Sequence, residues 1–329
     1  MEWDVKRLAA SMVIAGRTNG FSAGQNRTAT LAAVRGYREW LARYAQMRLV
    51  DVWYSKITEA DISATLEAAA GSPKIPAHRW RRWETILSSA RARDQLKAYD
   101  KLTTLVDGRP VIRDDPPIVE HVEIPGGTPA LEKIFTDYRA SMADNRRDFL
   151  ERYRFVDYAL KVVGVGSVGT RCFIVVLEGR DEGDPLILQG KQAEASVLAP
   201  YAGASAYQHQ GERVVTGQRA MQATSDIMLG WSRSELGRDF YFRQLWDQKG
   251  SVDTTTLKPW GLAFYGGLCG WSLARAHART GDAVAISAYL GTNDVFDAAI
   301  ADFAEAYADV NQRDHAVYRA AIGEQRVSV

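Results

Sequence analysis

The sequence predicts an α+β fold that is mostly helical, with a small antiparallel sheet in the middle of the chain. Apolar residues recur at helical spacing over both ends of the 329 residues. Between about 154 and 245 this spacing gives way to short runs rich in β-branched residues, separated by turns rich in Gly or Asp-Gly. The order is helices, then a small sheet that carries one helix, then helices again, which is typical of α+β proteins.

The composition excludes several classes of protein. A hydrophobic fraction of 46% and a charged fraction of 25% are those of a globular chain, not a disordered one. A net charge of +1 gives no electrostatic reason to expect a nucleic acid or a membrane surface as partner. Cys172 and Cys269 are too few for a disulfide framework or a thiolate zinc site. No apolar run approaches the ~20 residues of a membrane span. Charged residues interrupt the stretch before Leu8, and this pattern does not match a signal peptide. We therefore expect a cytoplasmic protein.

The first part of the chain is predicted to be helical. A helical pattern begins at once, over Met1–Ile14, and further patterns follow at about 22–47, 58–70 and 79–98. The stretch 102–129 differs, because it contains a short hairpin pattern from Val106 and then an extended, proline-bound segment. A boundary in this stretch divides the chain into a helical region 1–129, a small-sheet lobe 130–250 and a helical region 251–329 that packs on the first.

The small-sheet lobe is expected to begin with a helix at about 130–150 and to continue as a five-stranded sheet. The predicted strands are Val156–Val163, Arg171–Leu177, Pro185–Lys191, Ile227–Trp231 and Arg238–Leu245. A helix at about 210–225 separates the third strand from the fourth. After Pro259 the pattern is helical nearly to the end of the chain.

Gly164–Gly169 has the sequence G-V-G-S-V-G, a G-x-G-x-x-G pattern that serves two unrelated folds. A dinucleotide-binding loop of the Rossmann type must open a helix, whereas Thr170–Leu177 has the pattern of a strand. A strand, a glycine loop and a second strand are instead the arrangement of a kinase glycine-rich loop, which closes over the phosphates of ATP. The alternative is a tight turn in a small sheet with no ligand.

The kinase interpretation requires a lysine on the third strand, and Lys191, one of only ten lysines, supplies it. It could equally be a solvated edge charge. A helical carboxylate should orient that lysine, for which Glu194 and Glu212 are candidates; Glu212 is favoured because it opens an amphipathic helix. The purine hinge would lie near Leu245–Asp247. The predicted cofactor is ATP with Mg²⁺, and the predicted binding residues are Gly164, Gly166, Ser167, Gly169, Lys191, Glu212 and Gln244.

No catalytic residue and no metal ligand can be assigned from the sequence. Phosphoryl transfer needs a positioning Asp, an Asn and a metal-binding Asp. His277–Asp282 superficially resembles the start of such a loop, but Ser287 stands where the Asn should be and no metal-binding Asp motif follows. We expect His277 to be a packed or surface residue of a helix, and Asn293–Asp294 with Asp297 to form a helix N-cap and its first turn.

Several stretches of the chain resemble the bacterial domain-of-unknown-function family DUF2252, over essentially its whole length. They are Glu2–Ser11, Val162–Cys172, Leu188–Lys191, Gly211–Arg219, Phe240–Leu245 and Leu273–Arg279. The resemblance implies a longer N-terminus, with a Gly-Asp-x-His-x-x-Asn loop and an Asp-x-Asn-Asp segment like those of aminoglycoside-type phosphotransferases. We infer a circularly permuted kinase-like fold, in which region 1–129 is part of the C-lobe plus a helical insertion. The helix at 258–279 would precede the catalytic loop, the Met1–Gly16 helix would follow the metal loop, and Asp4 would brace the catalytic loop. This chain is expected to be N-terminally truncated and to lack that loop.

Two functions follow as hypotheses. The first is a kinase-like ATP-binding protein, a phosphotransferase fragment whose acceptor is an unknown small molecule or protein. The second is a non-catalytic, pseudokinase-like interaction module that uses the same lobe as a scaffold, with aromatic helix faces such as Tyr37, Trp40 and Tyr44 as a partner surface; such faces are more often core. A Rossmann dehydrogenase is a distant third. Because the central loops would be absent, we also expect exposed apolar helix faces and instability or oligomerisation.

Overall fold

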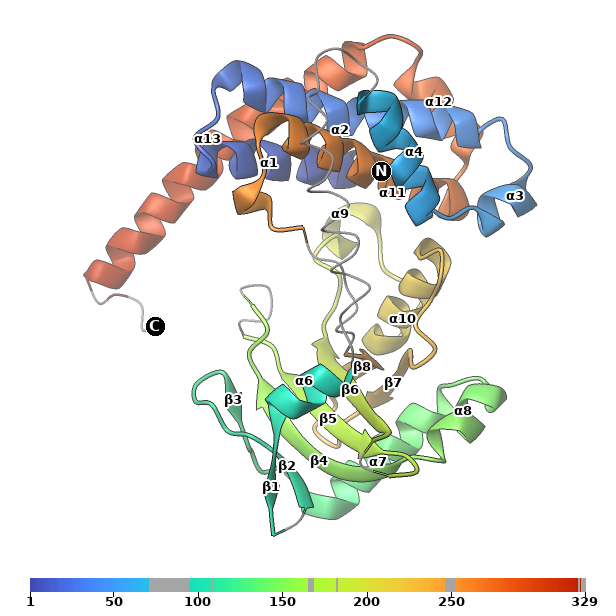
Figure 1. The fold of residues 1–329 in the computed structure, drawn as a ribbon, viewed down its shortest axis with the longest axis vertical. Helices are drawn as coiled ribbons and strands as arrows, with labels where there is room; N and C mark the ends of the chain where they lie inside the picture. The colour runs from blue at the N-terminus through green and yellow to red at the C-terminus, as the bar shows by residue number, and fades with distance from the viewer. Residues whose placement is uncertain are drawn as a thin grey trace. The chain divides into compact units, whose positions relative to one another are not determined.

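The computed structural model describes residues 1–70, 95–107, 109–164, 169–181, 183–245, 252–324 and 326 (Figure 1). The chain divides into two compact units, and each is described by itself. Unit 1 comprises Met1–Ser63 and Val252–Val329, and unit 2 comprises Ala64–Ser251. Unit 1 is helical and unit 2 holds the sheet, so the predicted α+β class is confirmed.

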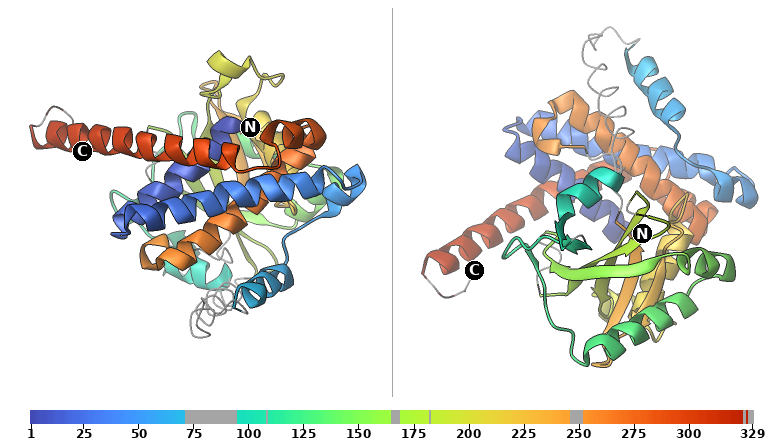
Figure 2. Two further views of the ribbon diagram at one scale, coloured as in Figure 1. Left: turned by 90° about the horizontal axis from the view of Figure 1, so that it is seen from above. Right: turned by 60° about the horizontal axis from the view of Figure 1, so that its bottom comes forward.

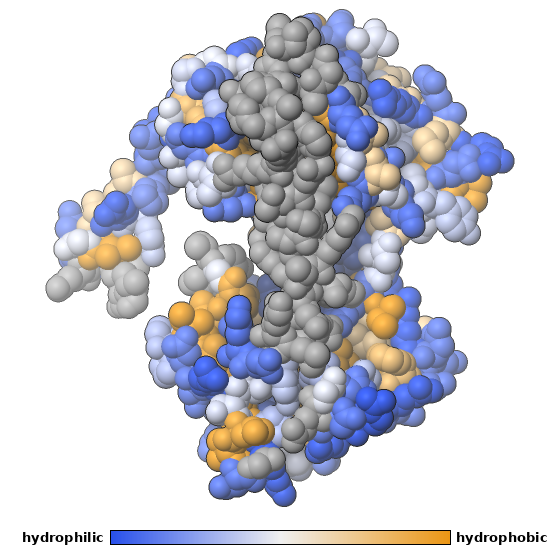
Figure 3. Space-filling model, viewed as in Figure 1, coloured by the Kyte–Doolittle hydropathy of each residue, from blue (hydrophilic) through white to orange (hydrophobic). Residues whose placement is uncertain are grey.

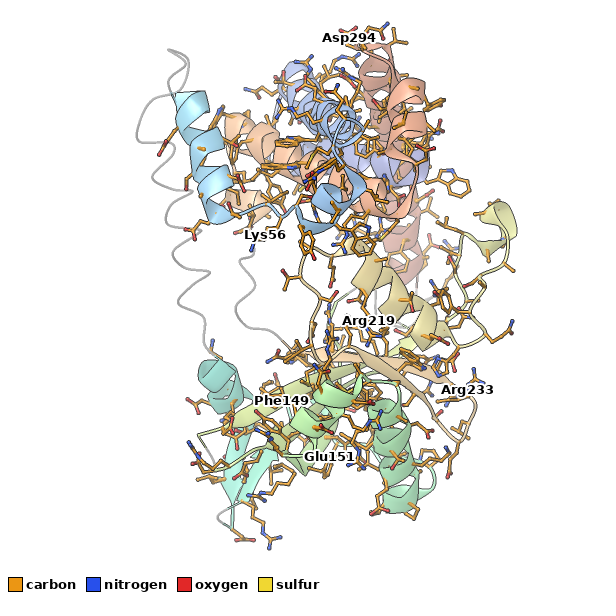
Figure 4. The ribbon with its side chains drawn as sticks, turned by 90° about the vertical axis from the view of Figure 1, so that its right-hand side faces the viewer. Lys56, Phe149, Glu151, Arg219, Arg233 and Asp294 are labelled. Atoms are coloured by element: carbon orange, nitrogen blue, oxygen red, sulfur yellow. The ribbon has the colours of Figure 1, made fainter. Side chains whose placement is uncertain are left out.

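Unit 1 is a bundle of helices drawn from both ends of the chain (Figure 2, left). Its elements are α1 (Glu2–Thr18), α2 (Ala23–Tyr44), α3 (Leu49–Tyr54), the start of α4 (Glu59–Ala70), the 3₁₀ turn η2 (Thr254–Thr256), α11 (Pro259–Thr280), α12 (Ala283–Leu290) and α13 (Val295–Gly323). Ser22 and Gln25 form a capping box that starts α2. Asp294, labelled in Figure 4, precedes α13 at its N-cap position, as the sequence predicts.

Helices α2 and α11 lie in close contact because small residues face each other along both of them. A Cβ atom on Gly36 would stand 2.9 Å from the carbonyl oxygen of Gly267, and one on Gly266 would stand 3.2 Å from that of Ala29. The buried core of unit 1 includes Val5, Val34, Leu41, Trp271 and Ile300. Segments from the two ends of the chain therefore share one core, which requires the backbones of α2 and α11 to approach closely.

Unit 2 contains a six-stranded antiparallel sheet of order β3-β4-β5-β6-β8-β7. The strands are β3 (Val119–Glu120), β4 (Arg154–Lys161), β5 (Cys172–Glu178), β6 (Pro185–Ala193), β7 (Gly230–Arg233) and β8 (Asp239–Gln244). The expected five strands are all present, but the sheet has a sixth. The number was wrong because Val119 and Glu120 lie in the extended segment after the hairpin and pair with Lys161 and Leu160 of β4. A separate hairpin is formed by β1 (Thr103–Val106) and β2 (Arg109–Ile112).

Each face of this sheet carries its own hydrophobic core. The helices α7 (Gly127–Ala140) and α8 (Asp144–Leu150) cover one face through Tyr138 and Leu150, which pack on residues such as Leu188 and Phe242. On the other face, Tyr99 of α6 (Gln95–Leu102) and Ile112 of β2 pack on residues of the central strands such as Ile174 and Ile187. Alternation along each strand thus divides its side chains between two cores.

The remaining elements differ from the predicted ones mainly at their ends. The single helix expected at 130–150 is two helices, α7 and α8, separated by Ser141–Ala143. The helix expected to reach Ser225 is α10 (Gln210–Met221), and a short α9 (Ala199–Ala202) precedes it. β7 begins at Gly230, because Asp226 accepts a hydrogen bond from the backbone N–H of Met228 and holds that stretch in a turn.

Each unit exposes apolar side chains. Figure 3 shows apolar areas on the visible surface of both units, among polar ones. In unit 1, Leu49 and Tyr54 of α3 are exposed, and in unit 2 so are Leu105 and Val106 of the β1–β2 hairpin. Among the helices of the described ranges, none combines the length and the apolar character that a membrane crossing requires.

Candidate nucleotide-phosphate site

The glycine loop joins β4 to β5, between the second and third strands of the sheet order. Gly164 has φ +128° and Gly169 has φ +80°, which are conformations that L side chains rarely adopt. A Cβ atom at either position would meet nothing within 4 Å, so backbone conformation and not lack of space calls for glycine here. Gly166 and Ser167, which the sequence also assigns to the site, lie outside the described residues.

Lys191 lies on β6, the third of the five predicted strands, at the end of the sheet that carries the glycine loop. It stands directly opposite Cys172, the first residue of the strand after the loop, and opposite Tyr241 of β8 on its other side. Directly opposed residues point to the same face of an antiparallel sheet. Lys191 therefore shares a face with Cys172, and that face also carries Gln189 and Arg243 one row further along.

Three cationic residues, Lys161, Lys191 and Arg243, share this face with the Cys172 thiol. Burial raises the pKa of that thiol, whereas the charges of Lys191, Arg243 and Lys161 act in the opposite direction. Arg243 donates two hydrogen bonds to the side-chain oxygen of Gln189, at 2.8 and 3.1 Å. No carboxylate in the described ranges forms an ion pair with Lys161, Lys191 or Arg243. Among the residues that the structure describes, this row of positive charge therefore has no acidic partner.

The two carboxylates considered as partners of Lys191 do not contact it in this structure. Glu212 lies in the first turn of α10, where its backbone N–H is capped by His209, and its carboxylate makes no ion pair with Lys191. Glu194 accepts a hydrogen bond from the side chain of Gln192 instead. The lysine and both carboxylates belong to the described residues, so the predicted pair is absent from this conformation.

Gln244 and the predicted hinge lie apart from the cation row. Gln244 stands opposite Leu188, whose side chain belongs to the other face of the sheet, and its backbone N–H bonds to Asp226 at 2.6 Å. The backbone N–H of Leu245 bonds to the carbonyl of Ile187, and its side chain packs in the core beside α6. Trp246 and Asp247, the rest of the predicted hinge, lie outside the described residues.

The structure adds site residues that the sequence interpretation did not single out. Lys161, Gln189 and Arg243 share the face of Lys191, and their positions follow from a period of two once the strand register is known. The register itself depends on pairing between β6 and β8, whose paired residues are about fifty apart in the chain. For this reason the strand pattern alone could not indicate them.

Elsewhere in unit 2, Arg233 of β7 (labelled in Figure 4) pairs with the buried Asp239 of β8. His121 bridges two carboxylates, with Nδ1 at 2.9 Å from Asp114 and Nε2 at 3.0 Å from Asp157. Burial alone would lower the pKa of His121, but the hydrogen bonds with Asp157 and Asp114 outweigh it and raise that pKa. The Arg233–Asp239 pair and the His121 group join neighbouring elements of the unit and do not include Lys161, Lys191 or Arg243.

In unit 1, His277 is buried and connects two helices to α11. Its Nδ1 lies 2.8 Å from the hydroxyl of Tyr37, and its Nε2 lies 3.2 Å from the carboxylate of Asp4. The expectation that His277 is a packed helix residue is thus confirmed, since only 8% of its side chain is exposed. Burial lowers the pKa of His277, and the nearby Asp4 carboxylate opposes this only in part.

The comparison with protein families identifies the chain. A family model described as "Uncharacterized protein conserved in bacteria (DUF2252)" matches residues 1–321. The chain belongs to this family. The predicted DUF2252 membership is therefore confirmed over nearly the whole length. Neither a curated protein nor a solved structure matches this DUF2252 chain.

The described residues of this DUF2252 protein contain no group of three or more His, Cys, Asp or Glu side chains that could hold a metal ion. The candidate site described above combines the glycine loop with three cationic side chains, Lys161, Lys191 and Arg243. Such a set can hold phosphate oxygens, because backbone N–H groups and cationic side chains both donate to them.

Proposed function

We propose that unit 2 of this DUF2252 protein is a kinase-like ATP-binding lobe, in which Gly164–Gly169 lies over the phosphates and Lys191 contacts them. The observation that carries the proposal is the pairing of Lys191 with Cys172, the residue that begins the strand after the glycine loop. In this register the lysine of the third strand lies at the loop end of the sheet. A kinase lobe needs a lysine in that position, beside the phosphates that the loop covers.

The order of the elements supports the same proposal. β4, the glycine loop, β5, β6 with Lys191, α10, β7 and β8 follow one another in the order that the kinase interpretation requires. All five strands belong to one antiparallel sheet. A tight turn with no ligand would explain the two positive-φ glycines, but it would not explain three cations on the face beside the turn that have no acidic partner within the described chain.

The electrostatics also favour a polyanion. Lys161, Lys191 and Arg243 share one face of the sheet and form no ion pair within the described chain. A triphosphate would supply that compensation through charge-assisted hydrogen bonds, which are stronger than neutral ones. When bound, Mg²⁺ would neutralise further phosphate charge. We assign no residue of this chain to the metal.

A thermal-shift titration with Mg·ATP tests the proposal. At a ligand concentration 100 times the Kd, binding stabilises a folded protein by about 2.7 kcal/mol, so ATP should raise the melting temperature of the wild type. Lys191→Ala should remove this protection, because a hydrogen bond to a charged group contributes about 1.5–3 kcal/mol. Lys133→Ala is the matched control, since Lys133 is an exposed lysine of α7 paired with Asp137. Unchanged protection of Lys191→Ala by ATP would refute the role of the lysine.

The predicted role of Glu212 needs a separate experiment, because the pair is absent here. In many sites the polar contacts are long in the free protein and tighten when the ligand binds. A double-mutant cycle of Lys191→Ala and Glu212→Gln, measured as ATP affinity, should show coupling if Glu212 orients the lysine. The same cycle with Glu194→Gln serves as the control. Additive effects of Lys191→Ala and Glu212→Gln would exclude Glu212 from the site.

Turnover separates the two classes of function. Release of ADP by the pure protein with Mg·ATP, faster than from buffer alone, would identify a phosphotransferase or ATPase activity. Saturable ATP binding without ADP release, over a range of small-molecule and protein acceptors, would identify the non-catalytic interaction module. Both outcomes require the site around Lys191, so Lys191→Ala should abolish either signal.

A further inference from the structure

Unit 2 has a cavity on the face of the sheet opposite to Lys191. Its volume is about 390 Å³. Leu160, Phe173 and Phe240, from three different strands, form its floor, and Ala130 and Ile134 of α7 form one wall. Every residue that lines it belongs to unit 2 and to the described part of the chain. The cavity is therefore a feature of this unit alone.

Two loops complete the cavity at its mouth. The segment 122–125 leads from β3 into α7, and the segment 234–238 joins β7 to β8. They lie against each other, since a Cβ atom on Gly126 would stand 2.6 Å from a carboxylate oxygen of Glu235. Gly126 also has φ +88°, a conformation that favours glycine. The mouth thus has a defined shape, set by elements that are far apart in the sequence.

The lining combines an apolar interior with charges of both signs. The floor and the α7 wall are hydrophobic, and the charged residues among those that line the cavity are Arg171, Arg238, Glu123 and Glu235. In the described ranges none of these four makes an ion pair, and the guanidinium of Arg171 donates to the neutral side chain of Gln192 at 3.4 Å. Two basic and two acidic residues therefore line one cavity, and none of them forms an ion pair within the described chain.

We propose that this cavity binds a free α-amino acid with a large apolar side chain. The side chain of the ligand would occupy the space over Phe173 and Phe240. Its carboxylate would meet Arg171 and Arg238, and its ammonium group would meet Glu123 and Glu235. A ligand with a single charge would satisfy only one of these two sets, whereas a zwitterion satisfies both.

The size of the cavity agrees with this class of ligand. Small-molecule pockets span about 300–1,000 Å³, are mostly apolar and use few polar groups to orient the ligand. A volume of about 390 Å³ lies near the lower end of that range. A cavity of this size is large enough for one amino acid with an aromatic ring. The site does not depend on ATP, because it lies on the other face of the sheet.

Isothermal titration calorimetry of the full chain with L-tryptophan and L-phenylalanine tests the proposal. Saturable binding of at least one of them is expected. Removal of either charged group from the phenylalanine probe should weaken binding about tenfold or more, since each removes charge-assisted hydrogen bonds. The probes for this are 3-phenylpropionate, which lacks the ammonium group, and phenethylamine, which lacks the carboxylate. No binding of either amino acid, or equal binding of a singly charged analogue, would overturn the assignment.

Variants at the mouth place the ligand in this cavity. Arg238→Gln and Glu235→Gln should each weaken binding of the amino acid by about tenfold, and both side chains lie in a loop at the surface, where folding tolerates the change. Arg180→Gln is the control, because its side chain is 84% exposed beyond the other end of β5. Binding that survives both mouth variants unchanged would show that the amino acid occupies another site. Lys191→Ala should leave this binding intact, which distinguishes it from the ATP site.

Discussion

Replacement of Gly270 by alanine should destabilise unit 1 through the backbone contact between α2 and α11. A Cβ atom at this position would stand 2.8 Å from the backbone nitrogen of Tyr37 and closer still to the carbonyl oxygen of Ala33. Both of these atoms belong to the main chain of α2. They cannot rotate away as the end of a flexible side chain could, so one helix must shift.

The size of the effect follows from that geometry. Carbon and its neighbours rest at about 3.5–4.0 Å from each other, so the added methyl group requires a separation of the helices by roughly 1 Å. Overpacking of this kind costs typically 1–3 kcal/mol. We expect about 2–3 kcal/mol for Gly270→Ala, even though alanine is the better helix former by about 1 kcal/mol. For a unit of this size the melting temperature should fall by roughly 6–12 °C.

The assay is thermal and urea denaturation, followed by circular dichroism at the helical signal. Gly217→Ala is the matched control, because Gly217 is also a glycine inside a helix, but a Cβ atom added there would meet nothing within 4 Å. That variant should gain about 0.5–1 kcal/mol from helix propensity alone. If Gly270→Ala were as stable as the wild type while Gly217→Ala behaved as expected, the helices would not be in backbone contact and the packing argument would fail.

Three further predictions concern buried charges and titration. Asp297 is fully buried and accepts hydrogen bonds from two nitrogens of the Arg38 guanidinium, at 2.8 and 3.0 Å. Asp297→Asn should therefore lower the free energy of unfolding in urea by about 3–5 kcal/mol. Arg38→Met combined with Asp297→Leu should recover part of this loss. If this double variant recovered none of the lost stability, the ion pair would not be the cause of the loss. Burial lowers the pKa of His277. Its contribution to stability is therefore present above its unfolded pKa of about 6.5 and is lost as the pH falls. In His277→Gln the free energy of unfolding should fall less between about pH 7.5 and 5.5 than in the wild type. The pH dependence of the His121 contribution is opposite, because its two carboxylate partners outweigh burial and raise its pKa. This contribution to stability is present below about pH 6.5 and is lost as the pH rises through the raised pKa. A His121→Gln variant with the same pH profile of stability as the wild type would refute this.

The elements of unit 2 could be predicted from the sequence because local patterns determine them. The alternation in β5 and β6 and the glycine loop between β4 and β5 are visible in short windows. The same windows contain Lys191 and so place it on the third strand. The predicted ends of elements were less accurate. At β7, a single hydrogen bond from the backbone N–H of Met228 to the side chain of Asp226 decides where the strand begins.

Contacts between distant segments could not be predicted in this way, and they decide what each site can bind. The cation row needs the pairing of Lys191 with Tyr241, and the cavity needs residues near 123, 171 and 235 to meet. No period or spacing in the sequence indicates such meetings, because they depend on the tertiary fold. The two proposed sites therefore lie on opposite faces of one sheet and differ in chemistry. On one face, cations without an acidic partner in the described chain favour a phosphate ligand; on the other, apolar floor residues and charges of both signs favour a zwitterion. Gly190 of β6 stands opposite Phe173 and Phe242, on the cavity face, and directly precedes Lys191. A Cβ atom there would stand 2.7 Å from the Phe242 ring. A larger residue at Gly190 should therefore shift β6 and disturb both proposed sites, whereas changes at Arg238, Glu235 or Lys191 should disturb only one.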